Sequence, residues 1–166
     1  MSEVRQAEVR QAEVGDGDAI GEVHAASWEA VYAPLFSPEF GAEGVVSRRS
    51  RWHARIAEGV GVLLVASRGG RVLAFSHTVP STEREGYAEI LSFYGHPDGW
   101  GTGVAADLMA ETVLGLDRVH LWTLRDTAQS RRFYAKCGFV ETGGERDRDF
   151  GDGQPLAQVE YARVRP

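Results

Sequence analysis

The most informative stretch of the sequence, Trp100-Gly101-Thr102-Gly103-Val104-Ala105, follows a predicted strand and opens an amphipathic helix. Two glycines leave the backbone N–H groups open to an anion, and the helix N-terminus adds about half a positive charge. A pyrophosphate is the natural ligand of such a turn. Because Gly-x-Gly alone is also an ordinary strand-to-helix connection, the rest of the chain must decide between the two.

Two common nucleotide-binding motifs do not fit this stretch. A dinucleotide-binding fingerprint follows the first strand of its fold and carries a third small residue, here Ala106, but this stretch lies two-thirds along the chain. A P-loop needs a lysine after its last glycine, and the only lysine is Lys136.

Along the whole chain, hydrophobic periodicity predicts the order β-α-α-β-β-β-α-β-α-β-β. This is an α/β class with a mixed, mostly antiparallel sheet and helices on both faces, in one domain spanning residues 1–166. Gly69-Gly70 predicts a hairpin turn, and Gly138 predicts the end of the last helix. The predicted strands are 9–12, 62–67, 72–79, 87–94, 119–124, 139–142 and 158–164. The predicted helices are about 18–31, 39–58, 101–116 and 127–137.

Composition excludes several classes of function. The chain has 166 residues, and its 18 basic and 24 acidic side chains give a net charge of −6, which disfavours nucleic acids and anionic membranes. The longest apolar run, 60–66, is far shorter than the ~20 residues of a membrane span. With one cysteine, Cys137, neither an internal disulfide nor a cysteine-based metal site is expected. We expect no metal and a cytoplasmic location.

The N-terminus carries a short direct repeat, in which Glu3–Ala7 recurs as Glu8–Ala12. Two copies of five residues do not make a repeat fold. The second copy joins the first helix directly and is predicted to hold the first strand. Residues 1–8 are therefore expected to be a frayed extension.

A second motif, Arg131-Arg132-Phe133-Tyr134-Ala135-Lys136-Cys137-Gly138-Phe139, follows at a suitable distance. Together with the stretch from His96 to Ala105, it resembles the GNAT superfamily of acyl-CoA-dependent N-acyltransferases. The resemblance covers residues 9–164. It implies acetyl-CoA as the acyl donor, held at its pyrophosphate by Trp100, Gly101, Thr102, Gly103, Val104 and Ala105.

The motifs depart from the family pattern at three positions. Trp100 stands where the family usually has Gln or Arg, and Thr102 where Arg or Lys is common. Thr127 replaces an Asn, but it can still cap its helix and offer a hydroxyl to the cofactor. The first two changes remove side-chain charge near the pyrophosphate and leave the backbone N–H groups in place.

The resemblance also assigns the reacting groups. Backbone amides at Phe93, Tyr94 and Gly95, at the end of the fourth strand, match those that hold the pantetheine and the thioester oxygen. Tyr134 matches the general acid, since a phenol with a pKa near 10 is protonated at neutral pH. A core aromatic is the alternative for Tyr134.

Glu89 lies in an apolar strand and resembles the general-base glutamate of one branch of the family. Burial would raise its pKa towards that of a useful base. The alternatives are an ion pair with an arginine or a solvent-facing position. His24, His77 and His96 are rival bases; His24 lies on an apolar helix face and His96 precedes a proline.

The resemblance implies that the acceptor is a primary amine of a small molecule or a protein and that it attacks the thioester directly. Trp28 and Tyr32 resemble the variable substrate-binding region. The acidic residues between the last two strands could attract a cationic amine, or could simply be solvated. A non-catalytic acyl-CoA sensor is the alternative function, and monomer or homodimer stays open.

Overall fold

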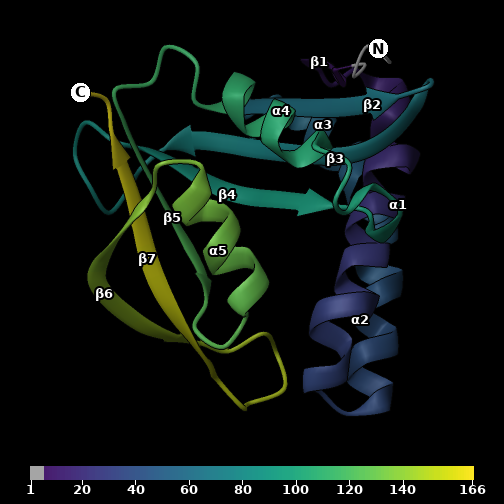
Figure 1. Cartoon of the computed structure of the whole chain (residues 1–166). Helices are drawn as coiled ribbons and strands as arrows, with labels where there is room; N and C mark the ends of the chain where they lie inside the picture. The colour runs from purple at the N-terminus through teal and green to yellow at the C-terminus, as the bar shows by residue number, and fades with distance from the viewer. Residues whose placement is uncertain (1–5) are drawn as a thin grey trace. The chain divides into compact units, whose positions relative to one another are not determined.

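Seven strands form the sheet in the order β1-β2-β3-β4-β5-β7-β6. The computed structural model describes residues 6–166 (Figure 1). β4 pairs with β5 in parallel, whereas β1–β2, β5–β7 and β6–β7 are antiparallel. The predicted mixed, mostly antiparallel sheet is confirmed. The strands are β1 (Glu8–Gln11), β2 (Val62–Arg68), β3 (Arg71–Pro80), β4 (Ala88–Gly95), β5 (Arg118–Leu124), β6 (Val140–Arg148) and β7 (Leu156–Val164).

The helices differ from the prediction at three places. The first ends at Ser27 and continues as a π-helical turn, Trp28–Tyr32. The second predicted helix, 39–58, is divided at Arg51, whose guanidinium turns back to the hydroxyl of Ser47 at 2.7 Å. The third predicted helix, 101–116, extends only over Val104–Thr112. The helices are α1 (Gly17–Ser27), α2 (Pro38–Ser50), α3 (Trp52–Glu58), α4 (Val104–Thr112) and α5 (Ala128–Lys136).

The chain divides into two compact units. The first holds the chain up to His77 together with Ser92–Thr112, and the second holds Thr78–Leu91 with Val113–Pro166. β3 and β4 therefore contribute residues to each unit. Within the described residues, no helix combines the length and apolar character that a membrane span requires.

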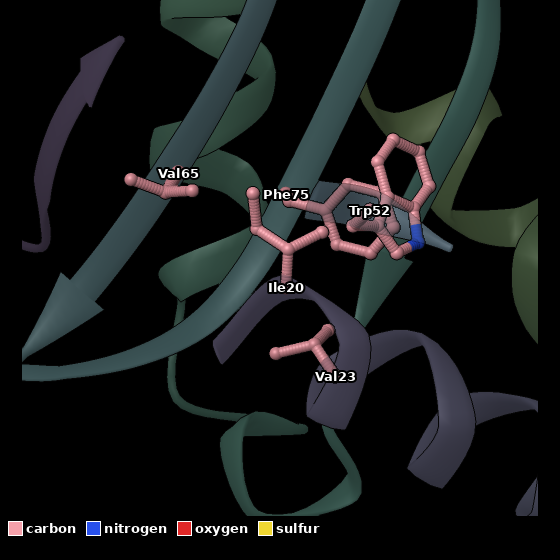
Figure 2. Close-up of a cluster of buried hydrophobic side chains, with 5 residues drawn as sticks. All are labelled: Ile20, Val23, Trp52, Val65 and Phe75. Carbon is pink, nitrogen blue, oxygen red and sulfur yellow. The ribbon is translucent and has the colours of Figure 1, made fainter. Parts of the chain in front are cut away.

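In the first unit, helices cover both faces of the sheet. Val65 of β2 and Phe75 of β3 pack with side chains of α1 and α3 (Figure 2). The neighbouring residues, Ala66 and Ala74, pack instead against Val104 and Leu108 of α4. Because successive residues of a strand point to opposite faces, α4 lies across the sheet from α1 and α3. The cluster in Figure 2 is Ile20, Val23, Trp52, Val65 and Phe75.

The second unit holds the antiparallel strands β5, β7 and β6, the first part of β4, which is parallel to β5, and helix α5. β6 is longer than predicted, because pairing with β7 runs from Val140 to Arg148 past an irregularity between Glu141 and Glu145. Two acidic residues expected in the loop, Glu145 and Asp147, therefore lie on a strand. At the end of α5, Gly138 has the predicted left-handed conformation (φ +88°).

The expected N-terminal extension overlaps the folded chain. Residues 1–5 lie outside the described range. The N–H of Ala7 donates to the carboxylate of Asp107 in α4 at 2.8 Å, and Glu8 begins β1. The last residues of the predicted extension are therefore part of the first unit.

Candidate functional site

The turn after β4 presents a row of backbone donors. Gly101 and Gly103 have φ of +74° and +87°, a conformation that β-branched residues strongly avoid. The first helical bond of α4 runs from the N–H of Asp107 to the carbonyl of Gly103. Within residues 6–166, the N–H groups of Gly101, Gly103, Val104 and Ala105 have no acceptor. This turn can therefore bind an anion through its backbone.

The two unusual side chains in this turn bind their own loop. The hydroxyl of Thr102 donates to the carbonyl of Gly99 at 2.6 Å. The indole N–H of Trp100 donates to the carbonyl of Gly95 at 3.1 Å, while 42% of the residue stays exposed. Neither side chain brings a charge to the donor row, as the sequence indicated.

Side chains at the end of β4 pack on both faces of the sheet in the first unit. Phe93 packs with the α4 cluster, whereas Tyr94 packs with the cluster of α1 and α3. The N–H of His96 then donates to the carbonyl of Leu73 in β3 at 2.8 Å. The peptides at 93–95, predicted to bind the thioester, are thus held by packing and by a neighbouring strand.

The predicted acceptor residues form an aromatic stack. The Trp28 and Tyr32 rings are nearly parallel with centroids 5.2 Å apart, and Tyr32 meets Tyr94 edge-on at 6.4 Å. Trp28 is only 2% exposed and its N–H donates to the carbonyl of Gly41. A Cβ at Gly44 would overlap the indole, so only glycine permits this approach. Trp28 therefore supports Tyr32, which is half-buried.

Glu89 is buried, with 8% of the residue exposed. Within the described chain, its carboxylate has neither a hydrogen bond nor an ion pair, so the arginine partner considered from the sequence is not found. Burial raises the pKa of Glu89, and the neighbouring His120 opposes that rise. His120 is its register partner on β5, which places both side chains on one face. A carboxyl group of raised pKa without a partner has the properties of a general base.

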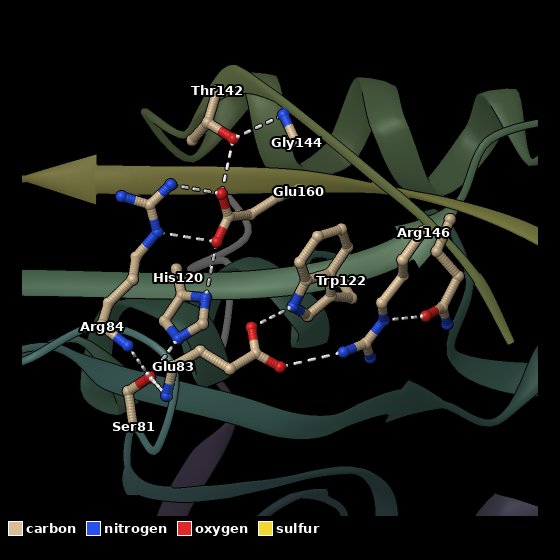
Figure 3. A network of polar contacts seen from close by, with 10 residues as sticks. Ser81, Glu83, Arg84, His120, Trp122, Thr142, Gly144, Arg146 and Glu160 are labelled. Carbon is tan, nitrogen blue, oxygen red and sulfur yellow. Dashed lines mark hydrogen bonds and ion pairs between the residues drawn. The ribbon is translucent and has the colours of Figure 1, made fainter.

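A buried network surrounds His120 (Figure 3). Its Nδ1–H donates to Glu160 at 2.9 Å, and Arg84 reaches the same carboxylate through two bonds of 2.8 and 2.6 Å. The hydroxyl of Thr142 donates to Glu160 at 2.6 Å. The hydrogen bond from Arg84 is the main reason that the pKa of Glu160 is lowered to about 2.

Ser81, His120 and Glu160 lie in the order of a serine–histidine–carboxylate relay, with Oγ of Ser81 2.6 Å from Nε2 of His120. The N–H groups of Glu83 and Arg84 also donate to that Oγ, at 3.1 and 3.0 Å. Both lone pairs of the hydroxyl are thus engaged, which leaves none for nucleophilic attack. The hydrogen bonds of Ser81 instead stabilise the loop 81–87 and connect it to His120 on β5.

Glu83, His120 and Glu160 also bring three potential metal ligands within 4.8 Å of one another. The carboxylate of Glu83 accepts from Trp122 at 2.9 Å and from Arg146 at 3.0 Å. Protein donors also hold Glu160, and both nitrogens of His120 have hydrogen-bond partners in Glu160 and Ser81. The three residues therefore fit a structural network better than a metal site.

Hydrogen bonds disqualify the three rival histidines as bases. Trp52 donates to Nδ1 of His24 at 3.0 Å, so Nε2 carries the proton. Burial lowers the pKa of His24 to about 2, with nearby arginines adding to the effect. Nδ1 of His96 accepts from the N–H of Asp98 at 3.0 Å. Nε2 of His77 binds a backbone carbonyl, and its Nδ1 is buried without a partner among residues 6–166. None offers an accessible lone pair.

Helix α5 positions Tyr134 in the second unit. Its ring is 8% exposed and contacts Phe139 and Tyr161, with centroids 6.0 and 6.2 Å apart. Thr127 is the N-cap residue, but its side chain makes no capping bond, which corrects the expectation from sequence. Burial raises the pKa of the Cys137 thiol, which disfavours a nucleophilic role.

A small cavity of the first unit lies elsewhere, with a volume of about 140 Å³. None of the residues predicted from the motifs lines it, and it is smaller than the ~300 Å³ at which ligand pockets begin. Its lining includes Gln11, Trp52, Arg55, Ile56, Val60 and His77.

Sequence reasoning missed the network around His120 entirely. Its members come from loop 81–87, β5, β6 and β7, so no local spacing connects them. The available signal was Glu160 within the apolar run Val159–Tyr161, a carboxylate that needs a buried partner.

Comparison with solved structures supports the same fold. The PaiA N-acetyltransferase of Thermoplasma acidophilum, solved with coenzyme A, is 20% identical with a TM-score of 0.71, covering 97% of this chain and 100% of that one. A GCN5-related N-acetyltransferase from Rhodopseudomonas palustris is 18% identical, with a TM-score of 0.74 and 97% of both chains covered. YjaB from Escherichia coli is 20% identical, with a TM-score of 0.73 and coverage of 98% and 100%.

A search of curated proteins gave no match. At the level of sequence, the profile of the acetyltransferase (GNAT) family matches residues 24–139. That range contains the donor row after β4, the end of β4 itself, Glu89 and Tyr134. It covers more than half of the chain. The protein therefore belongs to the GNAT acetyltransferase family.

Proposed function

We propose that the protein transfers an acetyl group from acetyl-CoA to a primary amine of a small molecule or a protein. The observation that carries this proposal is the row of unpartnered N–H groups at Gly101, Gly103, Val104 and Ala105. A Cβ on Gly103 would project into open space, so the backbone can be approached closely there. This fits a pyrophosphate, and the coenzyme A complex of the PaiA protein supports the choice of cofactor.

The backbone at Phe93, Tyr94 and Gly95 would hold the pantetheine and the thioester oxygen. N–H donors aimed at that oxygen stabilise the negative charge that develops on it during attack. Packing on both faces of β4 keeps these peptides fixed before the reaction begins. Thr127 would add its hydroxyl to the binding of the cofactor, because this side chain makes no capping hydrogen bond to helix α5.

Glu89 would take the proton from the attacking amine. Free alkyl ammonium groups titrate near pKa 10, so only about one in a thousand is neutral at pH 7. Glu89 lies four residues before Phe93, about 13 Å along an extended strand, which favours transfer through water. The absence of a usable lone pair on His24, His77 and His96 supports this choice.

Tyr134 would donate a proton to the departing thiolate as the bond between nitrogen and the acetyl carbon forms. The C–S bond breaks, coenzyme A leaves as the free thiol, and no covalent enzyme intermediate is needed. Tyr32, supported by Trp28 and Tyr94, would contact the acceptor through its ring.

The test is thiol release from acetyl-CoA against a panel of primary amines, including amino acids, polyamines and lysine peptides. Release that depends on the amine, with the acetylated product seen by mass spectrometry, supports the transferase. Tight binding of acetyl-CoA with no release for any amine would favour the sensor. No binding at millimolar acetyl-CoA would refute both.

A further inference from the structure

Trp100 is the side chain that the family pattern leaves unexplained. We propose that it is a positioning residue for the acyl-CoA: its indole N–H fixes the last peptide of β4, and its open ring face contacts the pantetheine arm. This inference rests on the proposed function, because it assumes that the donor row of α4 holds the cofactor.

The hydrogen bond from Trp100 completes the anchoring of the peptide between Gly95 and His96. The carbonyl of that peptide accepts from the indole at 3.1 Å, and its N–H donates to Leu73 at 2.8 Å. A Cβ on Gly95 would lie 3.8 Å from Cδ1 and Nε1 of Trp100, so the pyrrole edge rests against this glycine. With both its polar groups held, the peptide cannot rotate, and the amides just before it keep their direction.

The remaining ring surface is available to a ligand. Trp100 is 42% exposed, and within the described residues it makes no stacking or cation–π contact. It directly precedes Gly101, the first residue of the donor row. A cofactor reaching from that row to the end of β4 must pass the intervening residues 96–100. Of these, Trp100 carries the largest apolar surface, and a pantetheine chain would cover it favourably.

Two substitutions separate the two roles. Trp100→Phe keeps an aromatic face and removes the N–H, whereas Trp100→Ala removes both. Dissociation constants are measured by calorimetry for coenzyme A and for acetyl-CoA, whose difference reports on the thioester end. Leu114→Ala, which truncates an exposed side chain outside the proposed site, is the control. Melting temperatures establish that each variant is folded.

Trp100→Ala is expected to weaken coenzyme A about tenfold and acetyl-CoA about fiftyfold, because acetyl-CoA also loses the effect of the indole N–H. Trp100→Phe should leave coenzyme A within about twofold and weaken acetyl-CoA about fivefold, the effect of one neutral hydrogen bond. Binding should also change the tryptophan fluorescence of the wild type, and Trp100→Phe should reduce that change. Of the other three tryptophans, Trp28 and Trp52 are buried, and Trp122 is hydrogen-bonded to Glu83.

The outcomes separate the role of Trp100 from the proposed binding of acetyl-CoA. If the wild type binds neither ligand, the proposed function fails and the inference fails with it. If the wild type binds both but Trp100→Ala binds as tightly, only the role of Trp100 is refuted. Equal losses for the two ligands in Trp100→Phe would refute the fixing of the β4 peptide. Should Trp100→Ala be unfolded, Trp100→Phe still decides.

Discussion

The hydroxyl of Tyr134 can be removed without disturbing the packing of its ring against Phe139 and Tyr161. In Tyr134→Phe we expect turnover to fall 10²–10⁴-fold, the usual contribution of a general acid, with acetyl-CoA affinity within about twofold. Steady-state kinetics and calorimetry measure the two quantities. Unchanged turnover, under conditions where chemistry limits the rate, would leave Tyr134 as a core aromatic.

Glu89→Gln should affect the rate most at low pH. There the amine is fully protonated and a base is needed, whereas at high pH a larger share of the amine is already neutral. The expected loss is about 10²–10³-fold near pH 7 and shrinks towards pH 9. The pH–rate profile measures it, with Glu141→Gln as the control. A profile parallel to that of the wild type would show that Glu89 is not the base.

The same substitution should change stability with pH. Burial raises the folded-state pKa of Glu89, so its ionisation opposes folding, and stability is lost as pH rises through that pKa. Glu89→Gln avoids this loss. We therefore expect it to be more stable than the wild type at pH 8 and to lose that advantage at pH 4, as measured by urea unfolding. A constant difference across this range would contradict a raised pKa.

Gly103→Val should abolish acetyl-CoA binding. Its φ of +87° strains any β-branched residue, and the new side chain would occupy the space next to the donor row. Gly115→Val is a matched control, because Gly115 has φ +78°, has equally open surroundings and lies beyond α4. Both variants should lose about 1–2 kcal/mol of stability, but only Gly103→Val should fail in calorimetry. Normal binding by Gly103→Val would contradict the placement of the pyrophosphate.

For single residues, the sequence indicated which side chains are unusual better than it indicated which residues they contact. A carboxylate in the apolar strand of Glu89 indicated a perturbed group, and the structure confirms its burial. Trp28, predicted to lie in the substrate-binding region, is 2% exposed, because Gly44 lets α2 approach its indole closely and the carbonyl of Gly41 accepts its N–H. That approach depends on a residue of α2, Gly44, which no motif around Trp28 reveals.

Among the elements, the longest misjudged segment is β6. Its predicted end at Thr142 followed from a run of charged residues, yet the strand continues to Arg148. Arg146 is held by Glu83 at 3.0 Å, and Arg131 holds Glu141 at 2.7 Å. Glu83 lies 63 residues from Arg146 in the sequence, so from the sequence alone the charges of this segment resemble those of a loop.

The network around Glu160 should control stability in acid. Its pKa falls from 4.5 to about 2 on folding, so it stabilises the protein above pH 4.5 and that contribution is lost between about pH 4.5 and 2. Glu160→Gln should lose about 3 kcal/mol at pH 7 and much less at pH 2.5, as measured by urea unfolding. Glu141→Gln breaks an exposed ion pair and should lose less than about 1 kcal/mol. Equal losses for the two variants would contradict a stabilising role for the buried network.

For the whole chain, hydrophobic periodicity was enough to predict the sheet and nearly every helix. Alternating apolar residues gave the strands, and Gly69-Gly70 and Gly138 gave the turn and the helix end, whose glycines have positive φ as expected. The division of the chain into two units could not be predicted, because it cuts through β3 and β4 and not through a linker. Contacts between residues that are distant in the sequence define this division, and no change in composition marks it.

Binding of acetyl-CoA should stabilise the whole chain by mass action. A ligand that binds only the folded state adds about 2.7 kcal/mol at a concentration of 100 times Kd, which for a domain of this size raises Tm by ~5–10 °C. Tyr134→Phe should show the same shift as the wild type, because it keeps the binding backbone. Gly103→Val should show none, although it folds. A thermal-shift titration measures all three, and equal shifts in the wild type and Gly103→Val would mean that acetyl-CoA stabilises the protein from a site other than the turn before α4.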